Sequence, residues 1–242
     1  MRRLALVTGG AARIGAAIVQ LLHHNGYDIL LHYNRSHDKA TALANTLNAV
    51  RSHSVHLLQA DLLDAVALEK MGLTIIEQHQ RLDLLVNNAS SFFPTPLGTI
   101  TAAHWDNLLG SNARAPLFLC QQLAPLLQAS AGSIVNIIDS TSRYGLADFI
   151  PYAMAKAGLA NMTRSLARAV APSVRVNGVA PGAILWPEYE GGTTEAEQQA
   201  TLARTMLGRL GSPEDIANTV LFLANATYVT GQIIKVDGGV RS

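Results

Sequence analysis

A tyrosine and a lysine that could carry out proton transfer lie four residues apart in the second half of the chain. Tyr152 and Lys156 fall in a predicted helix, where this spacing places both side chains on one face. A lysine ammonium beside a phenol favours the phenolate, so we expect Lys156 to lower the pKa of Tyr152. A phenol with a lowered pKa is suited to proton transfer near neutral pH.

Two further polar positions are candidates for the same site. Asp139 ends an apolar run thirteen residues before Tyr152, and its carboxyl group, if protonated or linked through water, can feed a proton to Tyr152. Its neighbour Ser140 is an alternative, because a slip of one residue along a strand turns a side chain to the opposite face. Asn112 lies within a long helical pattern, where it either holds a helical irregularity or is a surface or capping residue.

The first apolar run leads into a segment of small residues and then into a helical pattern. This segment is Thr8-Gly9-Gly10-Ala11-Ala12-Arg13-Ile14-Gly15. Small residues let a backbone approach a pyrophosphate, and the free N–H groups at a helix start favour an anion. The G-x-G-x-x-G spacing is absent, so an ordinary glycine-rich turn is the alternative. Asp61, after a later apolar run, either accepts from the adenine amino group of a nucleotide or caps a helix.

The end of the second apolar run helps to choose the nucleotide. An NAD site usually places an acid there to hold the ribose 2′-hydroxyl, but no acid occurs before Asp38. Arg35 offers a planar fork for a 2′-phosphate, Ser36 adds a donor, and Arg13 can assist from the glycine-rich segment. The sequence therefore favours NADPH over NADH.

Short apolar runs alternate with helical patterns along the chain. The predicted strands are Leu4–Thr8, Tyr27–Tyr33, Ser54–Gln59, Leu82–Asn87, Gly132–Ile138, Val174–Ala180 and Gln232–Val236. The predicted helices are Ile14–Asn25, Lys39–Val50, Asp64–His79, Ala102–Ala129, Pro151–Ala171, Glu195–Leu207 and Pro213–Ala224. Alternation of this kind predicts an α/β fold, a single Rossmann-type doubly wound parallel β-sheet flanked by helices on both faces. We find no repeat or linker, so residues 1–242 are expected to form one dinucleotide-binding and catalytic domain.

Two long segments between these elements are expected to shape a ligand site. They are Ser90–Thr101 and Pro181–Thr194, and the second offers Trp186 and Tyr189 as walls of a pocket. Long loops beyond the carboxyl ends of parallel strands are where open α/β sheets bind ligands.

Composition excludes several classes of protein. The chain has 242 residues, 49% apolar and 14% charged, yet no run approaches the ~20 apolar residues of a membrane-spanning helix. The apolar run at the start ends at Thr8, short of a signal peptide, and the single cysteine suits a reducing compartment, so we expect a cytoplasmic protein. A net charge of +1 argues against nucleic-acid binding, and the histidine spacings predict no metal site.

Taken together, these segments resemble the short-chain dehydrogenase/reductase superfamily over the whole chain. The matching pieces are Thr8–Gly15, Asn87-Asn88-Ala89, Asn112, Tyr152-x-x-x-Lys156, the segment 176–182 and the ending Val236-Asp237-Gly238-Gly239. Arg13 stands where most members have glycine or alanine. Asp139 stands where most have the serine that polarises a carbonyl. Both departures resemble the pteridine reductases, as do the segments 32–36, 88–96 and 110–113.

This resemblance implies an NADPH-dependent pteridine reductase that passes hydride to dihydrobiopterin, dihydrofolate and, in some members, fully oxidised pterins. It implies a homotetramer that uses the helices at 102–129 and 151–171 as interfaces. The catalytic residues would be Asp139, Tyr152, Lys156 and Asn112, and the substrate would contact Arg13, Ser90, Phe92, Asp139 and Tyr152, with Phe92 stacked on the pterin. The cofactor would contact Gly9, Arg13, Ile14, Gly15, Tyr33, Asn34, Arg35, Ser36, Asp61, Leu62, Asn88, Ala89, Ser90, Tyr152, Lys156, Pro181, Gly182 and Ile184.

Two other functions stay open at this point. A carbonyl reductase of the same superfamily, such as a 3-oxoacyl thioester reductase, would use Ser140 in the serine role. A non-catalytic NADP-sensing regulator on the same fold is a weaker alternative, because such proteins commonly lose the tyrosine or the lysine, and this chain has both.

Overall fold

A computed structural model describes residues 2–187 and 192–240. Seven strands form one sheet in the order β3-β2-β1-β4-β5-β6-β7, and every neighbouring pair is parallel. The strands are β1 (Arg3–Val7), β2 (Tyr27–Tyr33), β3 (Val55–Gln59), β4 (Leu84–Asn87), β5 (Ser133–Ile137), β6 (Arg175–Pro181) and β7 (Ile233–Val236). The strand order reverses between β1 and β4, so the crevice for a ligand is expected at the carboxyl ends of these strands.

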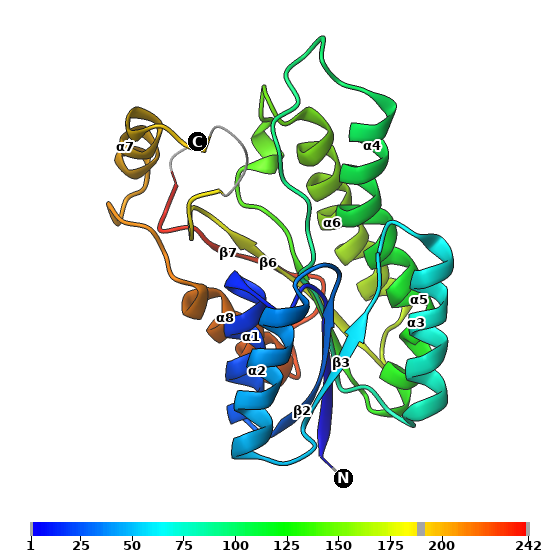
Figure 1. The fold of residues 1–242 in the computed structure, drawn as a ribbon. Coiled ribbons are helices and arrows are strands. Elements are labelled where there is room, and N and C mark those ends of the chain that lie inside the picture. Colours follow the sequence, from blue (N-terminus) through cyan, green and yellow to red (C-terminus); the bar gives the residue numbers. More distant parts are fainter. Residues whose placement is uncertain (1, 188–191, 241–242) are drawn as a thin grey trace.

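Helices cover both faces of the sheet, which confirms the predicted architecture (Figure 1). One layer contains α1 (Arg13–His24), α2 (His37–Val50) and α8 (Pro213–Asn225). The other contains α3 (Ala65–Gln78), α4 (Ala102–Leu109), α5 (Ala115–Ala129) and α6 (Ile150–Ala169), with a short 3-10 turn at Ser142–Tyr144 before α6. The remaining helix, α7 (Glu195–Arg204), lies apart from both layers (Figure 1).

The alternating direction of the side chains along each apolar strand explains the two layers. In β1, Ala5 and Val7 pack in a cluster with α1, α2 and α8, whereas Leu4 and Leu6 pack in a second cluster with α3 and α5. Successive side chains of a strand point to opposite faces, so a strand that is apolar throughout requires cover on both sides. Within the described ranges, none of the helices has the length and apolar character needed to span a bilayer.

Two predicted helices need correction. The range Ala102–Ala129 is not one helix, because a π-helix at Gly110–Arg114 separates α4 from α5. The helix predicted at Glu195–Leu207 ends at Arg204, since Thr205 leaves the helix to form an isolated bridge with Val240. The seven predicted strands all occur, and none of their ends shifts by more than two residues.

Candidate active site

The glycine-rich loop after β1 is packed too tightly for side chains. Gly9 has a φ of +61°, a conformation that favours glycine. A Cβ atom on Gly15 would lie 2.1 Å from the carbonyl oxygen of Gly9 and 2.7 Å from Nδ2 of Asn88. The first turn of α1 therefore sits directly against the loop, and its N-terminus faces the edge of the sheet where β1 ends. This bare backbone fits the pyrophosphate of a dinucleotide, whose close approach needs a loop without side chains.

The end of β4 holds this loop in place. Asn88 Nδ2 donates to the carbonyl oxygens of Thr8 (2.9 Å) and Gly9 (3.1 Å). In return, Thr8 Oγ1 accepts from the backbone N–H groups of Asn88 (2.9 Å) and Ala89 (3.0 Å). The structure thus brings the predicted residues Asn88 and Ala89 to the predicted glycine-rich loop.

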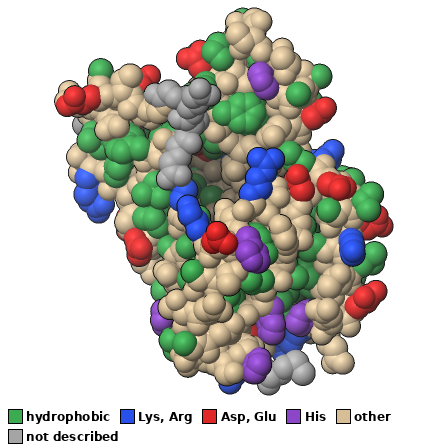
Figure 2. Space-filling model, in the orientation of Figure 1, with side chains coloured by type: hydrophobic (Ala, Val, Ile, Leu, Met, Phe, Trp, Pro, Cys, Tyr) green, Lys and Arg blue, Asp and Glu red, His purple; other side chains and the backbone are tan. Residues whose placement is uncertain are grey.

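Arg13 reaches from this loop to the segment after β6. Its φ is +52°, which is uncommon for a residue with a side chain, and such strain tends to persist at functional positions. Its guanidinium donates to the carbonyl oxygen of Trp186 (3.0 Å), so the side chain crosses the crevice between the two loops. Figure 2 shows a hollow on this side of the molecule, with Lys or Arg side chains at its rim.

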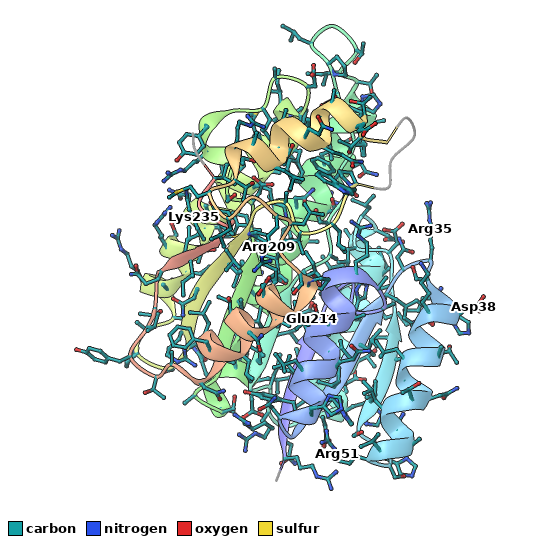
Figure 3. The ribbon with its side chains drawn as sticks, turned by 90° about the vertical axis from the view of Figure 1, so that its left-hand side faces the viewer. Arg35, Asp38, Arg51, Arg209, Glu214 and Lys235 are labelled. Atoms are coloured by element: carbon teal, nitrogen blue, oxygen red, sulfur yellow. The ribbon has the colours of Figure 1, made fainter. Side chains whose placement is uncertain are left out.

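The residues predicted to select the nucleotide lie at the end of β2. Arg35 and Ser36 are exposed, and the labelled Arg35 and Asp38 extend from the edge of the molecule (Figure 3). Ser36 is the N-cap of α2, yet its hydroxyl makes no capping hydrogen bond, which leaves it available to a ligand. Asp61 Oδ1 accepts from the N–H of Leu63 (2.9 Å) and so stabilises its own turn.

The catalytic pair predicted from the sequence meets the carboxylate predicted to assist it. The Tyr152 hydroxyl donates to Oδ2 of Asp139 at 3.2 Å, from the first turns of α6 to the segment after β5. The other carboxylate oxygen, Oδ1, accepts from the N–H and Oγ1 of Thr141 and from the N–H of Ser142, all within 2.8 Å. Three donors therefore fix the Asp139 carboxylate in one orientation, with Oδ2 directed at the phenol.

The expected lowering of the pKa of Tyr152 is wrong. The pKa of Tyr152 is raised well above its ordinary value, first by burial of the phenol and then by the negative charge and hydrogen bond of Asp139. Lys156 is itself buried, and its ammonium donates to the carbonyl oxygen of Ile137 (2.9 Å) and lies 5.8 Å from the centre of the Tyr152 ring. Burial lowers the pKa of Lys156 to about 8, against an opposing effect of Asp139. Tyr152 is thus held in its protonated form.

Ser140 does not share the position of Asp139. Its N–H donates to the carbonyl oxygen of Pro181 (3.0 Å), which continues the pairing of β5 with β6 beyond the strand ends. Its hydroxyl is buried and has no hydrogen-bond partner among the described residues. The geometry therefore places Asp139 rather than Ser140 against Tyr152.

Asn112 is the centre of the π-helix between α4 and α5. It is fully buried, and its Nδ2 donates to the carbonyl oxygens of Leu108 (3.0 Å) and Ser91 (2.9 Å). Its Oδ1 accepts from Oγ of Ser90 at 2.6 Å. The predicted helical irregularity is confirmed, and it ties the segment after β4 to the helix layer. The surface interpretation of Asn112 is wrong.

Aromatic rings form one side of the site. Phe92 stacks on Phe149 with 4.6 Å between ring centres and 1° between planes, and it meets Tyr152 edge-on at 4.8 Å. The segment that carries Phe92 is attached to the start of α6 by the N–H of Thr95, which donates to the carbonyl oxygen of Asp148 (2.6 Å). Sequence reasoning missed Phe149, although an aromatic residue three positions before Tyr152 was a usable signal.

The remaining predicted cofactor residues line the same edge of the sheet. The Tyr33 hydroxyl lies 2.9 Å from Nδ1 of His37, and the Asn34 carbonyl accepts from Gln59 (3.1 Å). Ile184 is buried, and a Cβ on Gly182 would lie 2.7 Å from Cα of Asp237, so the backbone after β6 is packed closely. The other members of the predicted set are Ile14, which lies in the first turn of α1 and packs against the core, Leu62, which is buried, and Pro181, the last residue of β6.

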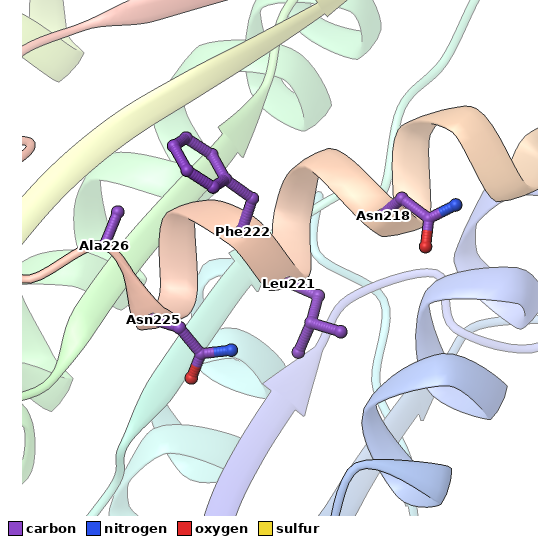
Figure 4. A pocket seen from close by; sticks show the side chains of 5 residues that line it. All are labelled: Asn218, Leu221, Phe222, Asn225 and Ala226. Atoms are coloured by element: carbon purple, nitrogen blue, oxygen red, sulfur yellow. The ribbon is translucent and has the colours of Figure 1, made fainter.

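Other features of the described residues lie outside this site. Tyr189, predicted as a pocket wall, falls outside the described residues. The described part of the chain holds no cluster of three or more His, Cys, Asp or Glu residues suited to a metal ion. A separate groove runs along α8, lined by Asn218, Leu221, Phe222, Asn225 and Ala226 (Figure 4). It contains none of the residues that could transfer a proton.

The sheet, the bare glycine-rich loop and the buried tyrosine and lysine define a Rossmann-type oxidoreductase. A family model described as enoyl-(acyl carrier protein) reductase matches residues 9–241. The chain belongs to this family, which lies within the short-chain dehydrogenase/reductase superfamily and includes pteridine reductase-like relatives.

The names of proteins similar to this chain indicate different substrates. Pteridine reductase 1 of Leishmania tarentolae is 35% identical over 277 residues, covering 98% of this chain and 95% of that protein. The 3-oxoacyl-(acyl-carrier-protein) reductase FabG of Staphylococcus aureus (strain Mu50) is 34% identical over 244 residues, covering 99% and 98%. A solved structure, the blue fluorescent protein from a metagenomic library in complex with NADPH, is 36% identical with a TM-score of 0.89, covering 99% of this chain and 98% of that one.

Proposed function

We propose that this protein is an NADPH-dependent pteridine reductase that reduces dihydropterins, including dihydrobiopterin and dihydrofolate, to their tetrahydro forms. The observation that carries the proposal is the hydrogen bond between Tyr152 and Asp139, at a position where a carbonyl reductase of this superfamily places a serine. The similarity to a pteridine reductase over nearly the whole chain supports it. In this proposal, residues 1–242 form one dinucleotide-binding and catalytic domain.

The residues at the carboxyl edge of the sheet fit NADPH. The bare loop at Gly9 and Gly15 suits the pyrophosphate, while exposed Arg35 and the free hydroxyl of Ser36 suit the 2′-phosphate. The similar solved structure holds NADPH. When bound, NADPH supplies the hydride.

The protein's own part in the reaction is to deliver a proton to nitrogen. Reduction of a C=N bond adds hydride to carbon and a proton to nitrogen, and no oxyanion develops that would need a serine donor. Because the pKa of Tyr152 is raised, its hydroxyl still carries its proton before hydride transfer. Asp139, at 3.2 Å, receives the next proton from solvent and restores the phenol. Lys156 places a positive charge beneath Tyr152, which stabilises the phenolate left after transfer.

A flat, aromatic substrate suits the remaining walls of the site. Phe92 is partly exposed and its ring is held by stacking on Phe149, and in this proposal the ring also contacts the pterin. Ser90 and Arg13 supply hydrogen bonds to the polar edge of the pterin in this proposal. Ser90 is positioned for this by its hydrogen bond to Asn112.

A carbonyl reductase acting on 3-oxoacyl thioesters is the second candidate. It is favoured by the 34% identity to the FabG enzyme, close to the 35% identity to the pteridine reductase. It would require the Ser140 hydroxyl, which is buried and lacks a partner among the described residues, to turn toward the substrate.

A substrate panel distinguishes the two candidates. NADPH oxidation is followed at 340 nm with dihydrobiopterin, dihydrofolate, biopterin and a 3-oxoacyl thioester. We expect turnover of the dihydropterins, and a loss of about 100-fold or more in Tyr152→Phe, which removes the proton donor. Tyr228→Phe is the matched control, since this tyrosine is fully exposed. Turnover of the thioester alone would refute the pterin proposal.

We also propose a homotetramer in the cytoplasm. Large apolar side chains are exposed on α4, α5 and α6, namely Trp105, Leu117, Phe118 and Met154. Contact between subunits would bury them, and the single cysteine, Cys120, is a free buried thiol, which suits a reducing compartment. Light scattering should give four times the mass of the chain, and a stable active monomer would contradict the proposal.

A further inference from the structure

One buried histidine of strand β2 joins two segments at the carboxyl edge of the sheet. His32 lies near the end of β2 and is 2% exposed. Its Nδ1 accepts from the N–H of Gly9 at 3.2 Å, and its Nε2 lies 3.1 Å from the carbonyl oxygen of Ala60. The backbone carbonyl of His32 also accepts from the N–H of Gly10 at 2.9 Å. One residue therefore holds two consecutive N–H groups of the glycine-rich loop and the segment after β3.

The contacts define the chemical form of the ring. A carbonyl oxygen only accepts, so Nε2 carries the proton and Nδ1 carries the lone pair that accepts from Gly9. Burial lowers the pKa of His32 to about 4, against the hydrogen bond to Ala60 and the charge of Asp61. The ring is thus neutral at neutral pH and in the one tautomer that satisfies both partners.

In the proposed NADPH site, the two segments joined by His32 would flank the adenosine half of the nucleotide. Gly9 belongs to the loop that fits the pyrophosphate. Ala60 immediately precedes Asp61 and Leu62, which are predicted to contact the adenine. We propose that His32 is a positioning residue that fixes the phosphate-binding loop and the adenine-binding segment in their positions relative to each other. This inference rests on the proposed NADPH binding and adds a determinant of cofactor affinity that does not touch the reacting atoms.

Amide substitutions can separate the two contacts. The oxygen of an asparagine side chain can stand where Nδ1 accepts from Gly9, whereas the amide nitrogen of glutamine can stand where Nε2 donates to Ala60. His32→Leu keeps the volume and removes both contacts. The matched control is His23→Leu, because His23 is another buried histidine whose Nε2 hydrogen-bonds a side chain, Ser54 Oγ, at 2.8 Å. His23 is next to the last residue of α1, far from the loop at its start.

The experiment measures binding of 2′,5′-ADP, the adenosine half of the cofactor, by calorimetry, together with KM for NADPH, kcat and urea unfolding. We expect His32→Leu to weaken 2′,5′-ADP about tenfold or more and to raise KM for NADPH equally, with kcat at saturating NADPH nearly unchanged. His32→Asn and His32→Gln should each recover part of this loss. His23→Leu should lower stability and leave the affinity unchanged.

Several results would overturn the inference, and they differ from failure of the proposed function. Wild-type affinity for 2′,5′-ADP in folded His32→Leu would refute the positioning role, and so would an equal loss in His23→Leu. If His32→Leu does not fold, wild-type affinity in both amide variants gives the same refutation. A wild-type protein that binds neither 2′,5′-ADP nor NADPH would instead refute the proposed function and the inference with it.

Discussion

Adding one methyl group at Gly15 should disable the nucleotide loop. In Gly15→Ala the new Cβ would lie 2.1 Å from the carbonyl oxygen of Gly9, whereas Cβ atoms keep at least 3.0 Å from such neighbours. The first turn of α1 or the loop must therefore move by about 0.9 Å. The hydrogen bond from Asn88 Nδ2 to Gly9, now 3.1 Å long, lies in the path of this movement.

The cost can be worked out from these contacts. Overpacking of a tight site costs about 1–3 kcal/mol and a lost hydrogen bond about 1 kcal/mol, so the free energy of unfolding should fall by about 2–4 kcal/mol. For a chain of this size, the melting temperature should fall by about 4–15 °C. A shift of almost 1 Å also lengthens the N–H contacts to a phosphate, which should weaken NADPH binding by about ten- to a hundredfold.

The assay combines urea unfolding with NADPH titration by nicotinamide fluorescence. Gly158→Ala is the matched control, because it adds the same methyl group within α6, where no atom lies within 4 Å. This control should bind NADPH as the wild type does. If folded Gly15→Ala binds NADPH within about threefold of the wild type, the loop is not where the phosphates approach, and the account of the nucleotide site is wrong.

Three further predictions concern the chemistry and the cofactor. Asp139→Ala should lower kcat with dihydrobiopterin by about 100-fold or more, while Ser140→Ala should change it little. A large loss in Ser140→Ala and a small one in Asp139→Ala would favour the carbonyl reductase. Arg35→Ala should reduce the ratio of kcat/KM for NADPH over that for NADH by about ten- to a hundredfold. Lys70→Ala is the control. An unchanged ratio in Arg35→Ala would exclude Arg35 from the 2′-phosphate site. Because burial lowers the pKa of Lys156 to about 8, its charge is lost as pH rises through that value, and kcat/KM should fall there. Asp139 raises this pKa, so the fall should move to lower pH in Asp139→Asn; a pH profile that does not move would contradict the assignment.

The sheet could be predicted from the sequence because local pattern determines it. Strands buried on both faces are apolar throughout, and the helical patterns between them leave parallel crossovers as the natural connection. The helix pattern at Ala102–Ala129 left two interpretations of Asn112 open, a helical irregularity or a surface residue, since Leu108 and Asn112 satisfy helical spacing equally well in either form. Only the contacts of Asn112 with the segment after β4 distinguish these interpretations.

The candidate site was predictable in its members but not in its electrostatics. Tyr152, Lys156 and Asp139 were found by type and spacing. The direction of the pKa shift of Tyr152 was not, because it depends on burial and on which carboxylate oxygen faces the phenol. The role proposed for His32 was equally hidden, since its partners Gly9 and Ala60 lie in the segments that follow two other strands, β1 and β3.

Isotope transfer tests the central claim most directly. NADPH that carries deuterium at both C4 positions of the nicotinamide is incubated with dihydrobiopterin and the wild-type protein, and the product is analysed by mass spectrometry. The account predicts tetrahydrobiopterin that carries one deuterium on the carbon of the former C=N bond. Its formation should require Tyr152. Unchanged dihydrobiopterin, together with deuterium transfer to the 3-oxo carbon of an acyl thioester under the same conditions, would contradict it.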